Sequence, residues 1–288
     1  SLATQGLQLG IDFKGGSSIT VTGEKEITEK DFRSDLKELG YEVENVDELT
    51  GGAMSARVVD TLSQSEIKET ESYFNEKYEA TTEIGVVSDV VKQELIKNAV
   101  LSLLLASIAI VLYISMRFTF TYAVGAIVAL LHDVFMMIGL FSIFRLEVNS
   151  MFIAAMLSIV GYSINDTIVT FDRIRENIDK KYHGNLKKKE QYMEVVNESL
   201  RETFGRSLVT TFTTLIPVVI LIFLGSHEIL NFNIALMFGL ISGVYSSLFI
   251  ASQLWLDLDY RRNQKKKKTP KKPKKKEDEE ILIKGINA

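Results

Sequence analysis

The longest stretch of the chain without a charged residue or histidine is ILNFNIALMFGLISGVYSSLFIASQLWL, at residues 229–256. A helix rises about 1.5 Å per residue, so a run of this length easily crosses the roughly 30 Å hydrocarbon core of a bilayer. Buried helices of a soluble protein would need a much larger polar shell around several such runs. We therefore interpret the chain as an α-helical polytopic membrane protein, with five spans at about 95–116, 118–144, 148–171, 204–224 and 229–256.

Charge is divided unevenly along the 288 residues, which have a formal net charge of -4. Residues 1–90 carry 8 Lys or Arg against 19 Asp or Glu, whereas 172–203 and the tail 257–288 are rich in Lys and Arg. Basic connections stay on the cytoplasmic side of a membrane. We therefore expect the loop 172–203 and the tail to be cytoplasmic, and the acidic domain 1–90 to lie outside, ahead of the transmembrane bundle 91–256.

Several chemistries are excluded by composition. The chain has no cysteine, which rules out disulfides, thiolate metal sites and a cysteine nucleophile, and its three histidines lack the spacing of metal ligands. We expect no metal and no cofactor. The acidic balance gives no reason to expect a nucleic acid partner, apart from the tail. The sequence KKKKTPKKPKKK at 265–276 predicts attraction to anionic membrane lipid, or contact with an acidic partner or ribosomal RNA.

The acidic segment 1–90 is expected to fold as a small ferredoxin-like α+β domain. Its pattern predicts the order βαββαβ, with a bend at Gly15-Gly16, a helix over 28–39 capped by Thr28 and a helix over 63–78. Because no nucleophile constellation or phosphate loop is present, we interpret it as a binding or gating module rather than an enzyme. A domain outside the membrane needs a way across, so we also expect a sixth span upstream of Ser1.

Charged groups inside apolar spans mark the expected functional site, because a charge at bilayer depth costs about 2.5–3.5 kcal/mol. Asp166 lies in the third span and Arg206 in the fourth. Each sits in a polar stripe at helical spacing, and we expect the two antiparallel helices to bring the stripes together as an ion relay. The stripes are Ser163, Asp166, Thr167 and Thr170 in one span and Arg206, Thr210, Thr213 or Thr214, and Pro217 in the other.

Simpler roles stay open for these residues. Arg206 can extend to the cytoplasmic surface, and Asp166 can lock helix packing. His132 and Asp133 are adjacent, about 100° apart on a helix, so they do not share a face; we expect Asp133 to be a secondary polar site or a packing residue. We expect Gly239, Ser242 and other small residues of the spans to allow close helix contact. The remaining small residues are Gly125, Ala126, Gly243, Ser246 and Ser247.

Four segments resemble the SecF family of bacterial protein-export membrane subunits, in the resistance–nodulation–division superfamily. They are GIDFKGG at 10–16, LHDV at 131–134, VGYSINDTIVTFDRIREN at 160–177 and FGRSLVTTFTTL at 204–215. By this resemblance, the family's intramembrane acid corresponds to Asp166, its basic partner to Arg206, and its threonine-rich stretch to Thr210, Thr213 and Thr214. Further motif residues are Gly10, Asp12, Gly15, Gly16, Gly161, Asn165, Asp172 and Arg173.

The resemblance implies a subunit of the bacterial cytoplasmic membrane that acts with SecD. It would use an ion gradient, H⁺ or alternatively Na⁺, to complete export of an unfolded polypeptide from SecYEG after SecA-driven pushing. Three alternatives remain: a structural scaffold of the Sec complex, half of a small-molecule exporter, and an intramembrane protease using Asp133 and Asp166. The sequence does not distinguish the coupling ion, or a separate SecF from half of a fused SecDF.

Overall fold

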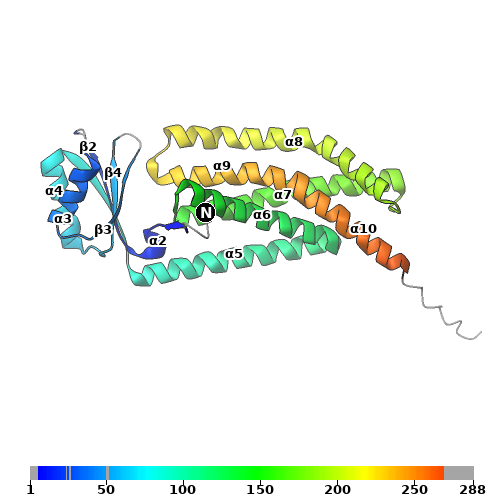
Figure 1. Cartoon of the computed structure of the whole chain (residues 1–288), viewed down its shortest axis with the longest axis horizontal. Helices are drawn as coiled ribbons and strands as arrows, with labels where there is room; N and C mark the ends of the chain where they lie inside the picture. The colour runs from blue at the N-terminus through cyan, green and yellow to red at the C-terminus, as the bar shows by residue number, and fades with distance from the viewer. Residues whose placement is uncertain (1–5, 24, 26, 50–51, 269–288) are drawn as a thin grey trace, which may run out of the picture.

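The computed structural model describes residues 6–23, 25, 27–49 and 52–268. A small α+β unit lies at one end of a long helical bundle, and the hairpin between α7 and α8 and the end of α10 lie at the other (Figure 1). This arrangement confirms the expected fold class. The polybasic sequence predicted to contact lipid lies outside the described residues from Thr269 onward.

The α+β unit has the predicted βαββαβ order. Its sheet is antiparallel, with the strand order β3-β4-β2-β5, and the two helices follow the first and third strands of the sheet. This order is the one expected of a ferredoxin-like unit. The elements are β2 (Gly16–Gly23), α3 (Glu29–Glu38), β3 (Val43–Glu48), β4 (Met54–Val58), α4 (Gln64–Tyr78) and β5 (Ala80–Val87).

Local signals explain where these elements begin and end. The hydroxyl of Thr28 caps α3 by accepting from the amide of Asp31, and Ser63 forms a reciprocal capping box with Glu66 on α4. Gly16 has a φ of +100°, and a Cβ there would lie 2.5 Å from the carbonyl oxygen of Val58. Only glycine therefore fits at the start of β2. The core beneath the sheet is formed by Ile19, Val21, Phe32, Leu36, Met54, Val58 and Phe74, among others.

The bundle contains five helical segments, among the described residues, that are long and apolar enough to cross a membrane. The last of them is continuous but not uniform, because the π-helix η2 (Ser246–Ala251) separates α9 from α10. The segments are α5 (Asp89–Arg117), α6 (Phe120–Phe144), α7 (Ser150–Tyr182), α8 (Lys189–Leu224), and α9 (Leu230–Tyr245) with η2 and α10 (Ser252–Lys268). A short 3₁₀ turn, η1 (His227–Ile229), precedes α9.

The segment 172–203 differs from the expected loop. It is helical except for residues 183–188, so α7 and α8 continue past their apolar runs into a long hairpin. Charged residues end the apolar runs but not the helices, because Ile174 and Val195 remain fully buried on the facing sides. Ion pairs on the outer surface, such as Lys181 with Glu194 at 3.0 Å, suit an amphipathic helix pair in water.

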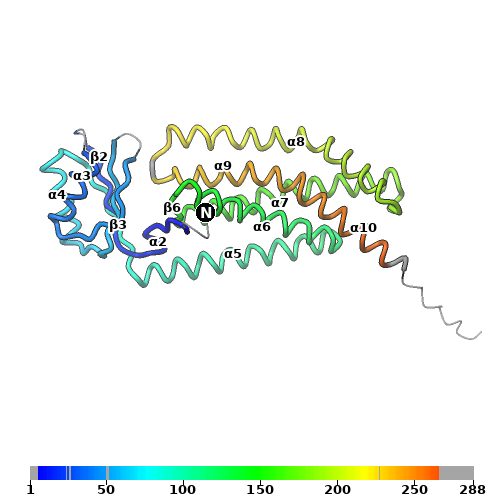
Figure 2. The backbone as a smooth tube through the Cα atoms, in the orientation of Figure 1, coloured from blue at the N-terminus to red at the C-terminus, as the bar shows by residue number. Residues whose placement is uncertain are grey.

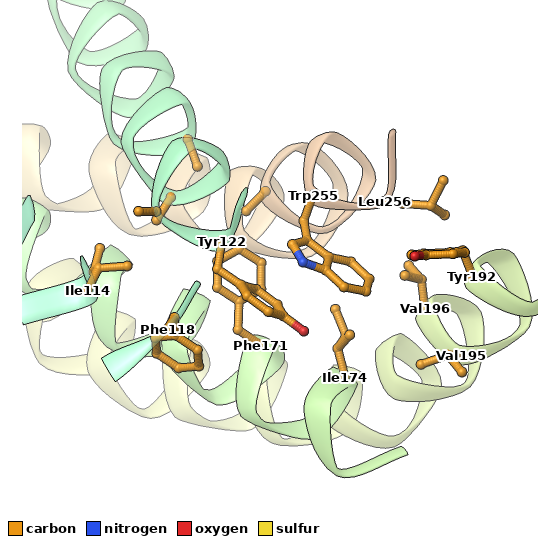
Figure 3. Close-up of a cluster of buried hydrophobic side chains, with 14 of the residues drawn as sticks. Ile114, Phe118, Tyr122, Phe171, Ile174, Tyr192, Val195, Val196, Trp255 and Leu256 are labelled. Carbon is orange, nitrogen blue, oxygen red and sulfur yellow. The ribbon is translucent and has the colours of Figure 1, made fainter. Parts of the chain in front are cut away.

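An aromatic cluster holds this end of the bundle together (Figure 3). The rings of Tyr122 on α6 and Trp255 on α10 stack with centroids 4.8 Å apart, and Phe171 of α7 packs edge-on against Tyr122. Tyr192 of α8 completes the contact with Trp255. Four helices therefore share one buried core here, which fixes their relative positions.

The N-terminal segment ties the α+β unit to the nearby end of the bundle, which is the end opposite the aromatic cluster. The two-residue strand β1 (Gln8–Leu9) pairs in parallel with β6 (Glu147–Val148), which lies between α6 and α7. The short helix α2 (Ile11–Lys14) follows. In the backbone trace this segment lies beside the ends of α6 and α7, between the bundle and the sheet (Figure 2).

Candidate functional site

Asp133 of α6 lies in a cage of serine hydroxyls. Its side chain is 1% exposed. Ser163 of α7 and Ser246 of η2 donate to Oδ2 at 2.6 and 2.7 Å, and Ser242 of α9 donates to Oδ1 at 2.7 Å. A buried carboxylate is stable only when its oxygens receive hydrogen bonds. Here the bonds come from two other segments of the bundle, so the carboxylate holds three segments together.

His132 adds a fourth polar contact to this carboxylate. Its Nδ1 lies 3.2 Å from Oδ1 of Asp133, and its ring packs against that of Tyr245 at 5.9 Å. The two residues do point in different directions, since the side chain of His132 is 27% exposed and that of Asp133 only 1%. The expectation that they share no face was therefore incomplete, because the imidazole is long enough to bend back to its neighbour.

The π-helix η2 explains how so many hydroxyls converge. A π-turn inserts an extra residue per turn, and here both Ser246 and Ser247 are fully buried. The hydroxyl of Ser247 lies 2.8 Å from that of Thr167 and donates to the carbonyl of Ser163 at 3.2 Å. Small residues in α9 allow the close approach, since a Cβ on Gly239 would collide with Ile159.

Asp166, the predicted relay residue, has a more open environment. It is intermediate in exposure. Ser207 of α8 donates to its Oδ1 at 2.6 Å, whereas its Oδ2 is buried without a hydrogen-bond partner among the described residues. The hydroxyl of Thr170, one turn further along α7, is buried without a partner in the same way. One half of this carboxylate is therefore free to accept a proton or another donor.

The predicted stripe on α7 divides between two neighbours. Ser163, Thr167 and Thr170 are completely or almost completely buried, and the first two bond toward α6 and η2. Asp166 instead bonds to α8. Residues three apart differ by about 60° around a helix, so Asp166 lies at the border of the stripe.

The expected stripe on α8 is rotated away from α7, which corrects the predicted geometry. The side chains that face α7 are Ser207, which bonds Asp166, and Thr211, whose hydroxyl lies 3.2 Å from that of Tyr162. Ser207 comes directly after the predicted Arg206, and Thr211 directly after the predicted Thr210. That offset rotates a side chain by about 100°, so the predicted threonines fall outside the interface. Arg206 stays at the edge of the interface, where it lines a pocket with Val169 and Asp172 of α7.

The predicted α8 residues lie on the outside of the bundle instead. Arg206, Thr210 and Thr213 are exposed, and Thr214 is partly exposed. The three threonine hydroxyls donate to carbonyls of their own helix, at 2.9 Å each.

The outer face of α7 carries two residues of the SecF-like motif. Gly161 and Asn165 are both exposed, and a Cβ added to Gly161 would meet nothing within 4 Å. Glycine is thus not required at this position by packing within the described chain. We name the exposed residues Gly161, Asn165, Arg206, Thr210 and Thr213 the outer polar face.

A charged pocket lies next to Asp166 toward the α7–α8 hairpin. It has a volume of about 360 Å³, and Val169 and Thr203, each within about one turn of the Asp166–Ser207 pair, belong to its lining. Arg206 lines it as well. The other charged residues around it are Asp172, Arg173, Glu176 and Glu202.

Ion pairs organise the motif residues beside this pocket. Asp172 pairs with Arg117 of α5 at 3.2 Å, and Arg173 pairs with Glu202 of α8 and Glu176 of α7 at 2.6 Å each. Asp172 and Arg173 therefore link α7 to its neighbours on both sides, as befits the predicted end of the apolar span.

The GIDFKGG motif forms the joint between the α+β unit and the bundle. The carboxylate of Asp12 accepts the amide of Ser150 at 2.7 Å, which caps the first turn of α7. The amide of Gly10 donates to the carbonyl of Val148 at 2.9 Å, and a Cβ on Gly10 would collide with Glu147. The helix that carries Asp166 thus begins at this motif.

No metal centre is formed by the part of the chain that the structure describes. Within those residues, no group of three or more His, Asp or Glu side chains lies close enough to hold an ion.

Two known protein-family patterns match the sequence. Residues 66–261 match the family described as protein export membrane protein SecD/SecF, C-terminal. The chain belongs to the SecD/SecF family. Residues 1–27, a stretch that contains the Gly15-Gly16 pair, match the SecD/SecF GG motif. The resemblance drawn from the four sequence segments is therefore confirmed.

SecF and SecDF relatives are similar over most of this chain. It is 44% identical over 254 residues to protein translocase subunit SecDF of Bacillus subtilis, covering 87% of this chain and 34% of that protein. It is 40% identical over 261 residues to protein translocase subunit SecF of Sebaldella termitidis, covering 88% and 83%. The crystal structure of SecDF from Thermus thermophilus superimposes with a TM-score of 0.80 at 34% identity, covering 90% of this chain and 35% of that one.

The chain thus spans about a third of the SecDF proteins it matches and most of the SecF protein. Its relatives are protein translocase subunits, so a role in transport through the Sec pathway is in line with the family.

Sequence reasoning missed several polar residues of the site. Ser242 and Ser246, expected only to allow close helix contact, both donate to Asp133. Ser207, which lies outside the predicted stripe on α8, donates to Asp166. The sequence does contain one signal for these residues. Ser242 and Ser246 are four apart within an apolar run, and such pairs share one face of a helix.

Proposed function

We propose that this chain is the SecF half of a protein-export complex in which the transmembrane ion gradient acts through Asp166. The observation that carries the proposal is the asymmetry of this carboxylate. One oxygen is held by Ser207, and the other is buried without a partner among the described residues. A carboxylate with a free oxygen next to a polar pocket is able to take up and release an ion without breaking its anchoring bond.

The energetics suit a coupling device. An elementary charge that crosses a membrane potential of 100 mV releases about 2.3 kcal/mol, which is enough to shift a two-state equilibrium by nearly 50-fold. We propose H⁺ as the coupling ion, with Na⁺ as the alternative. The chain itself is proposed to carry out no hydrolysis, and it needs no cofactor for this role.

A SecD-type half is the proposed partner at the outer polar face. Polar and cationic groups facing lipid are costly, so Arg206 and its neighbours on this face call for cover. SecDF relatives are about three times longer than the matched part and contain both halves in one chain by name. In this arrangement Arg206, Thr210, Thr213 and Thr214 line the seam between the halves, close to Asp166 rather than bonded to it.

Movement of α7 is proposed to reach the outer domain through the GG motif. Asp12 caps the first turn of α7, and β1 pairs with β6 immediately before that helix. A shift of α7 that follows a change at Asp166 therefore pulls on the segment leading into the sheet. The outer domain is proposed to contact the unfolded polypeptide that leaves SecYEG.

The proposed orientation follows from the charges. Residues 1–90 lie outside the bacterial cytoplasmic membrane, and the 172–203 hairpin and the tail 257–288 lie in the cytoplasm. The acidic α+β unit and the basic hairpin are at opposite ends of the bundle, which supports this orientation (Figure 1).

Asp166→Asn in the complete SecD–SecF complex tests the proposal. The assay is release of an exported substrate from membrane vesicles with and without an ion gradient. We expect the variant to lose the stimulation by the gradient while it still assembles with its partner, because Asn cannot take up a proton. Asp257→Asn, a change at an exposed carboxylate of α10, is the matched control and should retain full stimulation.

Two further arms make the outcome decisive. A protonophore and a sodium ionophore, added separately, identify the ion whose gradient matters. Arg206→Met compared with Arg206→Lys separates a residue of the seam, where only Lys retains activity, from a side chain that merely extends to the surface. Full gradient-dependent release by Asp166→Asn would overturn the relay and leave the structural scaffold as the function.

A further inference from the structure

A second pocket lies at the cytoplasmic end of the proposed orientation, between the start of α6 and the part of α10 that leaves the bundle. Its volume is about 690 Å³, which is in the range of pockets that hold small organic ligands. Apolar side chains form one part of its lining, namely Phe120, Val124 and Leu258. The polar part of the lining consists of Thr121 and three cationic side chains, namely Arg261, Arg262 and Lys265.

The positive charge of the two arginines is not neutralised within the described chain. Arg261 and Arg262 are exposed, and neither forms an ion pair within 4.0 Å with any residue that the structure describes. The half-buried acidic side chain of α10 is already engaged. Asp259 accepts hydrogen bonds at 3.0 Å each from Tyr192 and from Thr121, which also lines the pocket, so both of its oxygens already have donors.

The position of the pocket selects the kind of ligand. Phe120 begins α6 and is 73% exposed, and α10 continues past the apolar span into its basic segment at the same level. A ligand here needs an anionic group for the arginines and hydrocarbon for the apolar lining. A free phosphate supplies only the first, whereas a lipid of the inner leaflet supplies both.

We propose that this pocket binds an anionic phospholipid of the cytoplasmic leaflet. The planar guanidinium groups of Arg261 and Arg262 bind the phosphate with paired N–H donors, and Lys265 adds a further positive charge. Phe120, Val124 and Leu258 cover the first part of an acyl chain. The proposal rests on the orientation proposed above but is independent of the ion relay at Asp166.

Native mass spectrometry of the complete SecD–SecF complex tests the proposal by counting retained lipid. The complex is reconstituted with phosphatidylglycerol or with phosphatidylcholine and measured after identical delipidation. We expect the wild type to retain phosphatidylglycerol. The double variant Arg261→Gln/Arg262→Gln should bind this lipid about 30-fold more weakly, because each lost cation contributes about 1 kcal/mol and about 1.4 kcal/mol corresponds to a tenfold change in affinity. Lys187→Gln/Lys189→Gln, an equal loss of charge at the same end of the bundle, should retain it.

A second variant separates the pocket from general attraction by the basic tail. Val124→Trp fills the pocket without changing charge, and we expect it to lose the retained lipid as well. Thermal unfolding of each variant checks that the complex is intact. Equal retention of phosphatidylcholine, displacement by inorganic phosphate alone, or unchanged retention in both pocket variants would overturn the proposal; the last result would indicate a covering protein segment or binding by the tail.

Discussion

Asp133 and Asp166 are both aspartates in apolar helices, yet their surroundings are opposite. Asp133 is 1% exposed and receives bonds from three serines on two other segments. Asp166 is partly exposed, receives one bond from Ser207, and keeps one oxygen without a partner among the described residues. A carboxylate saturated with donors resists change, whereas a half-satisfied one is able to exchange partners. We therefore propose a packing role for the first and the ion site for the second.

The same substitution at both positions tests this assignment most strongly. We expect Asp133→Ala to lower the free energy of unfolding by about 3–5 kcal/mol, because three buried hydroxyls lose their acceptor. Asp166→Ala should lower it by less than about 1.5 kcal/mol, since only Ser207 loses a bond. Thermal unfolding of the complex in detergent measures both. Similar losses at the two positions would show that Asp166 is also a packing residue.

Removing one donor from each carboxylate sharpens the contrast. Ser246→Ala deprives the buried Oδ2 of Asp133 of one of its two donors, and we expect a loss of about 1–2 kcal/mol in unfolding free energy. Ser207→Ala should cost less than about 1 kcal/mol, because water from the adjacent pocket can replace the hydroxyl at Asp166. Denaturation of the two variants side by side gives the difference. An equal or reversed order contradicts the comparison.

A third carboxylate, Glu147 at the joint between the α+β unit and the bundle, provides the prediction with the smallest expected effect. Burial raises its pKa, and Arg57 opposes this rise while Asp47 and Asp12 add to it. Since the folded pKa is raised, the ionised form is the disfavoured one: the stability contribution is fully present below the unfolded pKa of about 4.3 and is lost as pH rises through the folded pKa. We expect Glu147→Gln to remove this pH dependence and to stabilise the protein at pH 7 by less than about 1 kcal/mol.

Unfolding measured between pH 4 and pH 8 checks the prediction for Glu147. Glu48→Gln, at an exposed position at the end of β3, is the matched control and should leave the profile of the wild type unchanged. A Glu147→Gln profile that still falls with rising pH by the wild-type amount would assign the dependence to another group.

The fold was largely predictable because its signals are local. Apolar runs long enough to span a bilayer and the cap at Thr28 depend only on neighbouring residues, and the structure has them as expected. The hairpin from α7 to α8 was not predictable from charge alone. Its buried residues Tyr192, Val195 and Val196 follow helical spacing, which a count of charges alone does not register.

The details of the site depend on helix rotation, which the sequence does not determine. Both Arg206–Thr210 and Ser207–Thr211 form polar pairs on α8, and only packing selects the second to face α7. The serine cage depends additionally on η2, since a π-turn changes which residues of a helix face inward. No periodicity rule contains that insertion.

The joint at the GG motif also has a consequence for the order of folding. Asp12 and Ser150 are 138 positions apart, whereas the strands of the sheet and its helices are all contained within residues 16–87. Contacts between distant residues form late, because closing a long loop costs entropy before any bond repays it. The α+β unit therefore has the means to fold as soon as it emerges, while its attachment to the bundle waits until both α6 and α7 have been inserted. During biogenesis, closure of the β1–β6 pair marks a completed membrane topology.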